Sequence, residues 1–405
     1  MTPTPPAPLP LTLPPAPRIA AIDAYRGFVM FLMLAEVLHL AAVAKAVPAT
    51  NPGKSFWEFV AHHQTHVEWG GCTLHDLIQP SFSFLVGAAL PFSLASRSAR
   101  GQSFARRAFH ALFRSLLLVW LGVFLRSVGQ PQTNWIFTDT LSQIGLGYFF
   151  LFLLGHTRER VQWLAFGVIL VGYWAFFAAS TPEVLPIEQT GVKAEWDHHP
   201  TGFGLHWDKN TNPAAAFDRW FLNLFPQAKP FVYNSGGYAT LNFIPTLATM
   251  ILGLIAGGGL RYPSDTKTKF WNLLGLGMGF LLAGYVADVT GLCPSVKRIW
   301  TPAWVLFSGG WCFLILAAFY AATDWSQWST WTFPLRVIGA NSILAYCMAH
   351  LIDKFILGTF KTHLGQDVFR QFGTAYEPFV GGVAVLAVYW LILLWLYQKK
   401  LFVRI

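Results

Sequence analysis

The sequence predicts an all-α, polytopic membrane protein, a bundle of about ten transmembrane helices, and three observations lead to that class. Of the 405 residues, 54% are hydrophobic and only 12% are charged, whereas soluble domains carry about 25% charged residues. The chain contains 18 Trp and 36 Phe, which suit the aromatic belts at the two membrane surfaces. Apolar runs of membrane-spanning length recur along the whole chain. We therefore expect the lipid bilayer to be the protein's main partner.

The apolar runs, each about 20 residues long, are separated by short polar connections. They cover residues 27–45, 74–96, 108–127, 139–155, 161–179, 238–258, 269–288, 302–322, 336–357 and 378–397. Residues 1–17 are rich in proline and lack the basic start of a signal peptide, so they are expected to form a disordered tail. Residues 18–405 are expected to form one transmembrane domain, with a long loop at about 180–237.

Lysine and arginine collect at alternate ends of these runs, which indicates the orientation of the helices. The richest connection is residues 97–107, and the connection between Ser127 and Asp139 has none. Both termini are therefore predicted to be cytoplasmic, and the 180–237 loop is predicted to be periplasmic. The net charge of +9 follows from this topology, and no nucleic-acid partner is expected. A loop of that length is either a lid or binding element, or a cap on the bundle.

Titratable side chains gather just before the second apolar run. The stretch from His66 to Pro80 holds an imidazole, an indole (Trp69) and a carboxylate (Asp76) at the mouth of a span. Ionisable groups are costly next to lipid, so the stretch is a candidate functional site. His66 has the chemistry of a general base near neutral pH or of a nucleophile that accepts an acyl group.

The partner of His66 stays open at this point, because Glu68, His75 and Asp76 are all close to it in the sequence. Asp76 has a structural alternative as well. With Thr73 it forms the [ST]xx[DE] pattern of a helix capping box.

Metal and nucleotide chemistry find little support in the motifs. His62 and His66 are four residues apart, so they would share a helix face, but no HExxH sequence follows and no metal is expected. Cys72 and Cys293 both fall near the predicted outer face, and a disulfide between them stays open. The chain has no GxxxxGK[ST], GxSxG or CxxC sequence, so ATP-driven and serine-hydrolase functions lack their motifs.

Other polar residues lie within or beside the apolar runs. Glu36 and Asn341 are expected to face the interior of the bundle. Arg26 follows Asp23 by three residues, so it either closes the first helical turn or anchors a phosphate group that arrives from the cytosol. The strongest basic cluster is explained either by topology or by an anionic cofactor, and its members are Arg97, Arg100, Arg106, Arg107 and Arg114.

Four segments form a pattern that goes beyond these single residues. Ile-Asp-Ala-Tyr-Arg-Gly occupies 22–27, and the spacing His-x-x-Trp-x-Gly-x-Thr-x-x-Asp-Leu-x-x-Pro-x-Phe-x-Phe-x-x-Gly occupies 66–87. Thr-Leu-Ser-Gln-Ile-Gly at 140–145 and Pro-Leu-Arg-Val-Ile-Gly-Ala-Asn-Ser-Ile-Leu-Ala-Tyr at 334–346 are less specific alone. From about Arg18 onward, the chain resembles the heparan-α-glucosaminide N-acetyltransferase family and its bacterial relatives.

The resemblance implies a polytopic enzyme, often a homodimer, that takes acetyl-CoA from the cytosol. Such an enzyme delivers the acetyl group to a glucosamine amine on the far side of the membrane, and the active-site histidine of the family would fall on His66. The first span of the family commonly carries an Asn near its outer end. Here Glu36 sits about one residue off that register, so either Glu36 takes over that role or the acceptor differs.

The residues and the resemblance together predict a transmembrane acetyltransferase of the bacterial inner membrane. Acetyl-CoA would bind from the cytoplasm, with its phosphates near Arg26 and the arginine cluster. A sugar or glycan acceptor would enter from the periplasm and meet His66, which would act as a base or carry the acetyl group. Asn341 or the Trp69 N–H would stabilise the oxyanion.

The alternative is a sugar or amino-sugar permease, in which His66, Glu36 and Asp76 form a proton relay. Paired, interrupted helices in matching halves of the chain would favour it, and the sequence shows no such symmetry.

Overall fold

The prediction of an all-α membrane bundle is confirmed. The computed structural model describes residues 19–193 and 195–403, so the tail predicted for residues 1–17 lies outside the described residues. Within that part of the chain, eight helices are long and apolar enough to cross a membrane, or nine if one bent pair counts as a single span. Apart from an isolated bridge between Gly70 and Val296, the described residues form no β-structure.

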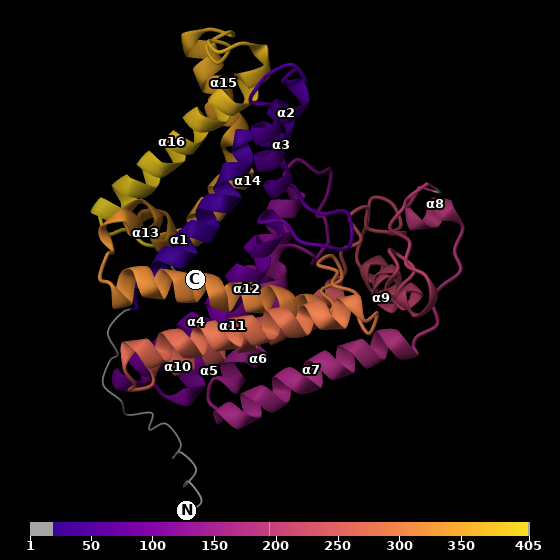
Figure 1. Cartoon of the computed structure of the whole chain (residues 1–405), viewed down its shortest axis with the longest axis vertical. Helices are drawn as coiled ribbons and strands as arrows, with labels where there is room; N and C mark the ends of the chain where they lie inside the picture. Colours follow the sequence, from indigo (N-terminus) through magenta and orange to yellow (C-terminus); the bar gives the residue numbers. More distant parts are fainter. Residues whose placement is uncertain (1–18, 194, 404–405) are drawn as a thin grey trace, which may run out of the picture.

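Seven long helices cross the bundle, each as one continuous α-helix. They are α4 (Ile78–Ala99), α5 (Phe104–Ser127), α7 (Glu159–Ala179), α10 (Phe243–Arg261), α11 (Thr266–Val289), α12 (Pro302–Tyr320) and α16 (Glu377–Gln398). Short turns extend four of them, namely η2 (His75–Leu77) before α4, η5 (Thr240–Asn242) before α10, η6 (Ala321–Trp325) after α12 and η8 (Thr374–Tyr376) before α16. Figure 1 shows α7, α10, α11 and α12 running alongside one another, with α1, α14 and α16 at an angle to them.

The first span is interrupted near its end. Helix α1 (Ala20–Leu34) continues as a 3₁₀ turn, η1 (Ala35–Leu38), before α2 (Leu40–Ala46). His39 between them has a positive φ of 49°, which a non-glycine residue adopts only under constraint. The Gln64 side chain supplies that constraint, because it accepts from the Leu40 N–H and donates to the Ala35 carbonyl. The interruption places Glu36 in a turn instead of a regular helix.

Two of the ten predicted spans differ from the structure. The run at 139–155 forms α6 (Thr140–Leu154), a helix of only 15 residues. The run at 336–357 is broken into three helices, α13 (Phe333–Ala340, after the turn η7, Thr330–Thr332), α14 (Ser342–Leu351) and α15 (Asp353–Leu364). The first break falls at Asn341, whose backbone leaves the helical region and whose side chain bonds the backbone of Leu401 and Val403.

The 180–237 segment, predicted as a loop, contains secondary structure of its own. Its elements are α8 (Ile187–Thr190), η3 (Gly202–Trp207), α9 (Pro213–Phe221) and η4 (Leu222–Leu224). Asn212 caps α9 by accepting from two backbone N–H groups, and Pro213 fits the first helical position. The remaining helix, α3 (Lys54–His63), precedes the stretch that holds His66.

The bundle has two ends, which we name by their residues. The His66 end comprises loop 64–74, loop 290–301 and the 180–237 segment, and the arginine end comprises the connections at 97–107, 155–159 and 261–266. Asp324 accepts from the Ala20 and Ala21 N–H groups at the start of α1, and α16 runs from η1 back toward the arginine end. The described chain therefore enters and leaves the bundle at the arginine end, and the prediction that this end is cytoplasmic stays a prediction.

Helices α4 and α10 pack closely against each other in the bundle. A Cβ at Gly87 would overlap the Met250 carbonyl, and one at Gly253 would overlap the Phe84 carbonyl. Small residues at such a crossing let two backbones touch, which is how helices associate inside a membrane. Glycine is therefore required at these positions for a steric reason.

Gly253→Ala is expected to destabilise the protein by about 1–3 kcal/mol, the range for an overfilled core, since the obstructing atoms belong to backbone. Gly258→Ala on the same helix is the matched control, because nothing lies within 4 Å of a Cβ there. The thermal unfolding midpoint in detergent should fall for the first variant and stay unchanged or rise for the second. Equal midpoints for the two variants would refute the contact.

Candidate active site

His66 and Asp76 form a hydrogen-bonded pair at the mouth of α4. The His66 Nδ1 atom lies 2.8 Å from Asp76 Oδ1. Two lone pairs at that distance would repel, so an ionised carboxylate fixes the proton on Nδ1 and leaves the lone pair on Nε2. The His66 side chain is 36% exposed and the Asp76 side chain is fully buried. Asp76 thus orients the imidazole ring through Nδ1 and leaves Nε2 as the basic nitrogen.

The second carboxylate oxygen of Asp76 is used locally. The Thr73 N–H donates to Oδ2 at 3.0 Å, the Thr73 hydroxyl lies 2.9 Å from it, and the Val67 N–H donates at 3.3 Å. The bond from the Thr73 backbone is the return bond of a capping box. Asp76 therefore fills both roles considered for it, with one oxygen anchoring the loop and the other facing His66.

Lys297, from loop 290–301, completes this group and was not among the predicted site residues. Its Nζ atom lies 3.2 Å from Asp76 Oδ1 and 3.0 Å from His66 Nδ1. The side chain is 3% exposed, which is rare for a lysine unless it is paired. The neighbouring Arg298 fixes loop 290–301 by donating to the carbonyls of Val67 and Gly236.

Burial lowers the pKa values of Lys297 and His66. Burial lowers the pKa of the Lys297 ammonium to about 8, against the opposing attraction of Asp76. Burial also lowers the pKa of His66, the hydrogen bond to Asp76 opposes that change, and the Lys297 charge adds to it. His66 is therefore neutral, and able to act as a base, at physiological pH.

Glu36 reaches this group through a second histidine. The His75 Nε2 atom lies 3.3 Å from Glu36 Oε1, and the His75 and His66 rings lie 4.4 Å apart between centroids. The Glu36 side chain is 56% exposed although it sits within the first span. The structure thus brings Glu36, His75, His66 and Asp76 together.

Trp69 lies on the other side of loop 64–74, against the 180–237 segment. Its ring is 4% exposed and packs edge-on against Trp196 at 5.9 Å. The Trp69 Nε1 atom is buried and has no hydrogen-bond partner among the residues that the structure describes. Glu68, considered as a partner of His66, instead accepts from Trp196 Nε1 at 3.0 Å. The 180–237 segment therefore adjoins loop 64–74 through Trp69 and Glu68.

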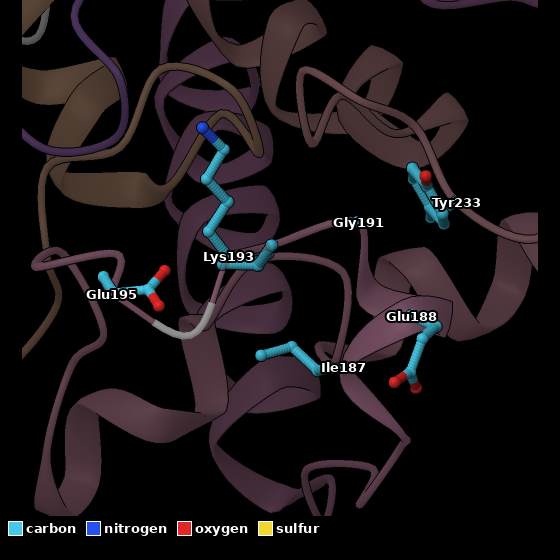
Figure 2. A pocket seen from close by; sticks show the side chains of 7 residues that line it. Ile187, Glu188, Gly191, Lys193, Glu195 and Tyr233 are labelled. Carbon is cyan, nitrogen blue, oxygen red and sulfur yellow. The ribbon is translucent and has the colours of Figure 1, made fainter.

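An open hollow of about 360 Å³ lies within the 180–237 segment. Figure 2 shows its lining, which is Ile187, Glu188, Gly191, Val192, Lys193, Glu195 and Tyr233. The Tyr233 ring lies directly on Gly191, where a Cβ would overlap it. None of the predicted catalytic residues lines the hollow. The hollow therefore belongs to the 180–237 segment, and His66 is not part of its lining.

The arginine cluster lies at the opposite end of the bundle. Arg97 contacts His110 at 3.2 Å, Arg100 donates to the Ser96 carbonyl, and Arg106 is exposed. Arg107 differs, because its Nε and Nη1 atoms are buried and have no partner within the described ranges. Arg114 donates to the Tyr148 hydroxyl at 3.1 Å. Its Nε atom is also buried and has no hydrogen-bond partner within the described ranges.

Two further predicted residues are Asn341 and Arg26. Asn341 is fully buried, and Gly339 beside it packs on Gly27, nine residues or roughly 14 Å of helix before Glu36. Its amide bonds Leu401 and Val403, so the structure does not bring Asn341 to His66. Arg26 lies 3.6 Å from Asp23 within α1.

No family model matches the chain, but two curated proteins do. Human heparan-alpha-glucosaminide N-acetyltransferase is 24% identical over 433 residues, which cover 96% of this chain and 60% of the human protein. The mouse protein of the same name is 24% identical over 434 residues, with 96% and 61% covered. This chain is a distant relative of heparan-alpha-glucosaminide N-acetyltransferase. It spans about three fifths of the length of these two relatives.

The relationship confirms the resemblance drawn from the motifs at 22–27 and 66–87. The match covers nearly the whole chain, so it includes both ends of the bundle. The names of the two relatives state the transfer of an acetyl group to a sugar nitrogen, which directs attention to the base at His66.

The cysteines and histidines give no indication of metal or redox chemistry. All four cysteines are free, so Cys72 and Cys293 are not joined. Burial raises the pKa of both thiols to about 12, which keeps them protonated and unreactive. Across residues 19–193 and 195–403, no three His, Cys, Asp or Glu side chains are placed to hold a metal ion.

Proposed function

We propose that this chain is a membrane acetyltransferase that moves an acetyl group from acetyl-CoA to an amino sugar or related glycan at the His66 end. The observation that carries the proposal is the oriented His66–Asp76 pair, which lies in a distant relative of an N-acetyltransferase. The positive-inside pattern supports a cytoplasmic arginine end. The proposed setting is therefore the bacterial inner membrane, with the acceptor reaching His66 from the periplasm.

In the proposed reaction, the neutral amine nitrogen forms a bond to the acetyl carbon while His66 Nε2 takes a proton from that nitrogen. The bond from the carbon to sulfur breaks, and the departing thiolate takes up the proton from the His66 imidazolium. Asp76 holds the imidazole in the required tautomer and stabilises the imidazolium that forms. A positioned base contributes about 10²–10⁴-fold to such a rate.

The arginine cluster fits the phosphate groups of the donor. A buried arginine nitrogen without a partner is costly, and a phosphate oxygen would satisfy those of Arg107 and Arg114 with charge-assisted bonds. Arg114 lies 13 residues, or roughly 20 Å of helix, from the end of α5 at the His66 end. A donor held there needs a long arm between its phosphates and its acyl group, as coenzyme A has. Acetyl-CoA would supply an activated acetyl thioester at His66.

Binding of acetyl-CoA is expected to raise the thermal unfolding midpoint of the purified protein in detergent. A ligand at 100 times its Kd stabilises the folded state by about 2.7 kcal/mol. The double variant Arg107→Gln/Arg114→Gln should lose most of that shift, because both arginines are assigned to the phosphates.

Arg160→Gln is the matched control, since Arg160 is exposed at the same end of the bundle and outside the cluster. It should keep the full shift. An absence of any shift at millimolar acetyl-CoA and CoA, or an equal loss in both sets of variants, would contradict the assignment of the phosphate site.

A further inference from the structure

We propose that Lys297 is a positioning residue of this site, whose ammonium group shares the Asp76 carboxylate with His66 and so keeps the imidazole neutral. The inference rests on the proposed function, because it assigns how the base at His66 is maintained.

In the resting site, one carboxylate oxygen of Asp76 faces two basic nitrogens. Asp76 Oδ1 faces both His66 Nδ1 at 2.8 Å and Lys297 Nζ at 3.2 Å, while its other oxygen is taken by loop 64–74. The two basic nitrogens are themselves 3.0 Å apart. One buried negative charge thus serves two groups, and protonating both would place two positive charges in contact.

Lys297 is the group that holds the charge in the resting site. Its side chain is buried, so its ammonium depends on Asp76 for compensation. An ammonium group is a weaker acid than an imidazolium by about four pKa units in water, so His66 is the group that gives up its proton. With Lys297 charged, His66 donates from Nδ1 to Asp76 and keeps its lone pair on Nε2.

Other titratable groups around His66 do not replace this effect. His75 and Asp76 face it from η2, Glu36 faces it from η1, and Cys72 lies in the same loop. Glu36 is occupied by His75, and the Cys72 thiol stays neutral. Arg298 stands behind Lys297 and bonds backbone carbonyls. Lys297 is therefore the cation nearest to the His66 ring in the described part of the chain.

The test measures the protonation of His66 directly with diethyl pyrocarbonate, which modifies neutral imidazole. The rate of modification of the peptide that contains His66 is followed by mass spectrometry as a function of pH. In the unaltered protein, half-maximal reactivity should fall below pH 6.5, the ordinary value for histidine. In Lys297→Met it should move upward by about 1 unit or more, because Asp76 then acts on His66 alone.

Lys297→Arg keeps the charge and should keep the midpoint of the unaltered protein. A purely structural lysine would lower stability or rate in both variants without moving the midpoint in Lys297→Met, and that result would overturn the inference. A midpoint at or above pH 6.5 in the unaltered protein would overturn it as well, even if Lys297→Met failed to fold.

The same profile separates this inference from the proposed function. If the protein transfers no acetyl group to glucosamine while the midpoints shift as expected, the function fails and the role of Lys297 stands. If the protein is active, the acid limb of kcat/KM should follow the midpoints of modification. If the protein is active but the acid limb of kcat/KM does not move in Lys297→Met, the role of Lys297 is refuted and the proposed function stands.

Discussion

His66→Ala is expected to lower acetyl transfer from acetyl-CoA to glucosamine by about 10²–10⁴-fold, the contribution of a positioned base. The loss should appear in kcat, since the imidazole acts on a proton that moves only during the reaction. The fold should survive, because the side chain is 36% exposed and forms no part of the apolar core. The shift of the unfolding midpoint with acetyl-CoA should therefore stay close to that of the unaltered protein.

His62→Ala is the matched control for this change. His62 lies in the last turn of α3 and is exposed, and no contact given for it reaches Asp76. It should retain most of the activity. Turnover in His66→Ala equal to that of His62→Ala would remove His66 from the reaction.

Asp76→Ala is expected to have the largest effect on stability of any change at the site. It leaves the buried Lys297 without its acidic partner, and breaking a buried ion pair in this way costs about 3–5 kcal/mol. Two backbone N–H groups of loop 64–74 also lose their acceptor. The variant should unfold at a lower temperature and should be inactive.

The deficit in Asp76→Ala should shrink as the pH rises. The pKa of Lys297 is already lowered by burial, and without Asp76 the folded state favours the neutral amine still more. The unfolded chain binds a proton that the folded chain does not, so stability increases with pH. The deficit of the variant should therefore shrink as the pH rises to about 8, above which Lys297 is neutral in the unaltered protein as well.

The double variant Asp76→Ala/Lys297→Met removes both charges and provides the control. It should be more stable at pH 7 than Asp76→Ala alone, because no uncompensated charge remains. Equal midpoints for the single and double variants, or a single variant as stable as the unaltered protein, would contradict the ion pair.

The candidate site could be predicted in part, because half of it is local in the sequence. His66, Thr73 and Asp76 lie within eleven residues of one another, and the capping pattern and the mouth of a span were visible there. Which carboxylate faces His66 depends on the path of loop 64–74. Lys297 follows Asp76 by 221 residues, and in the sequence it resembles any basic residue of a connecting loop. Only the packing of loop 290–301 against loop 64–74 makes it part of the site.

The spans show the same division between local and distant causes. Hydropathy located the apolar runs, since each run must satisfy the same bilayer thickness. The interruptions at His39 and Asn341 depend on Gln64 and on residues 401–403, which no window of neighbouring residues contains. Helix α9 has a local signal in the sequence, the Asn212-Pro213 pair at its start.

The contact between α4 and α10 has a consequence for how the molecule can move. The backbones touch at Gly87 and Gly253, so neither helix can slide or roll against the other without a collision. Helix α4 starts directly after Asp76 and carries Arg97 near its other end, while Asn242 at the start of α10 holds the carbonyl of Arg298. A permease that alternates its access needs helix groups that rock against each other, and a boundary between α4 and α10 would have to break these backbone contacts. Helix α4 thus separates the two ends of the bundle by its own length, and under the proposed function the acetyl donor would have to bridge that length to reach His66.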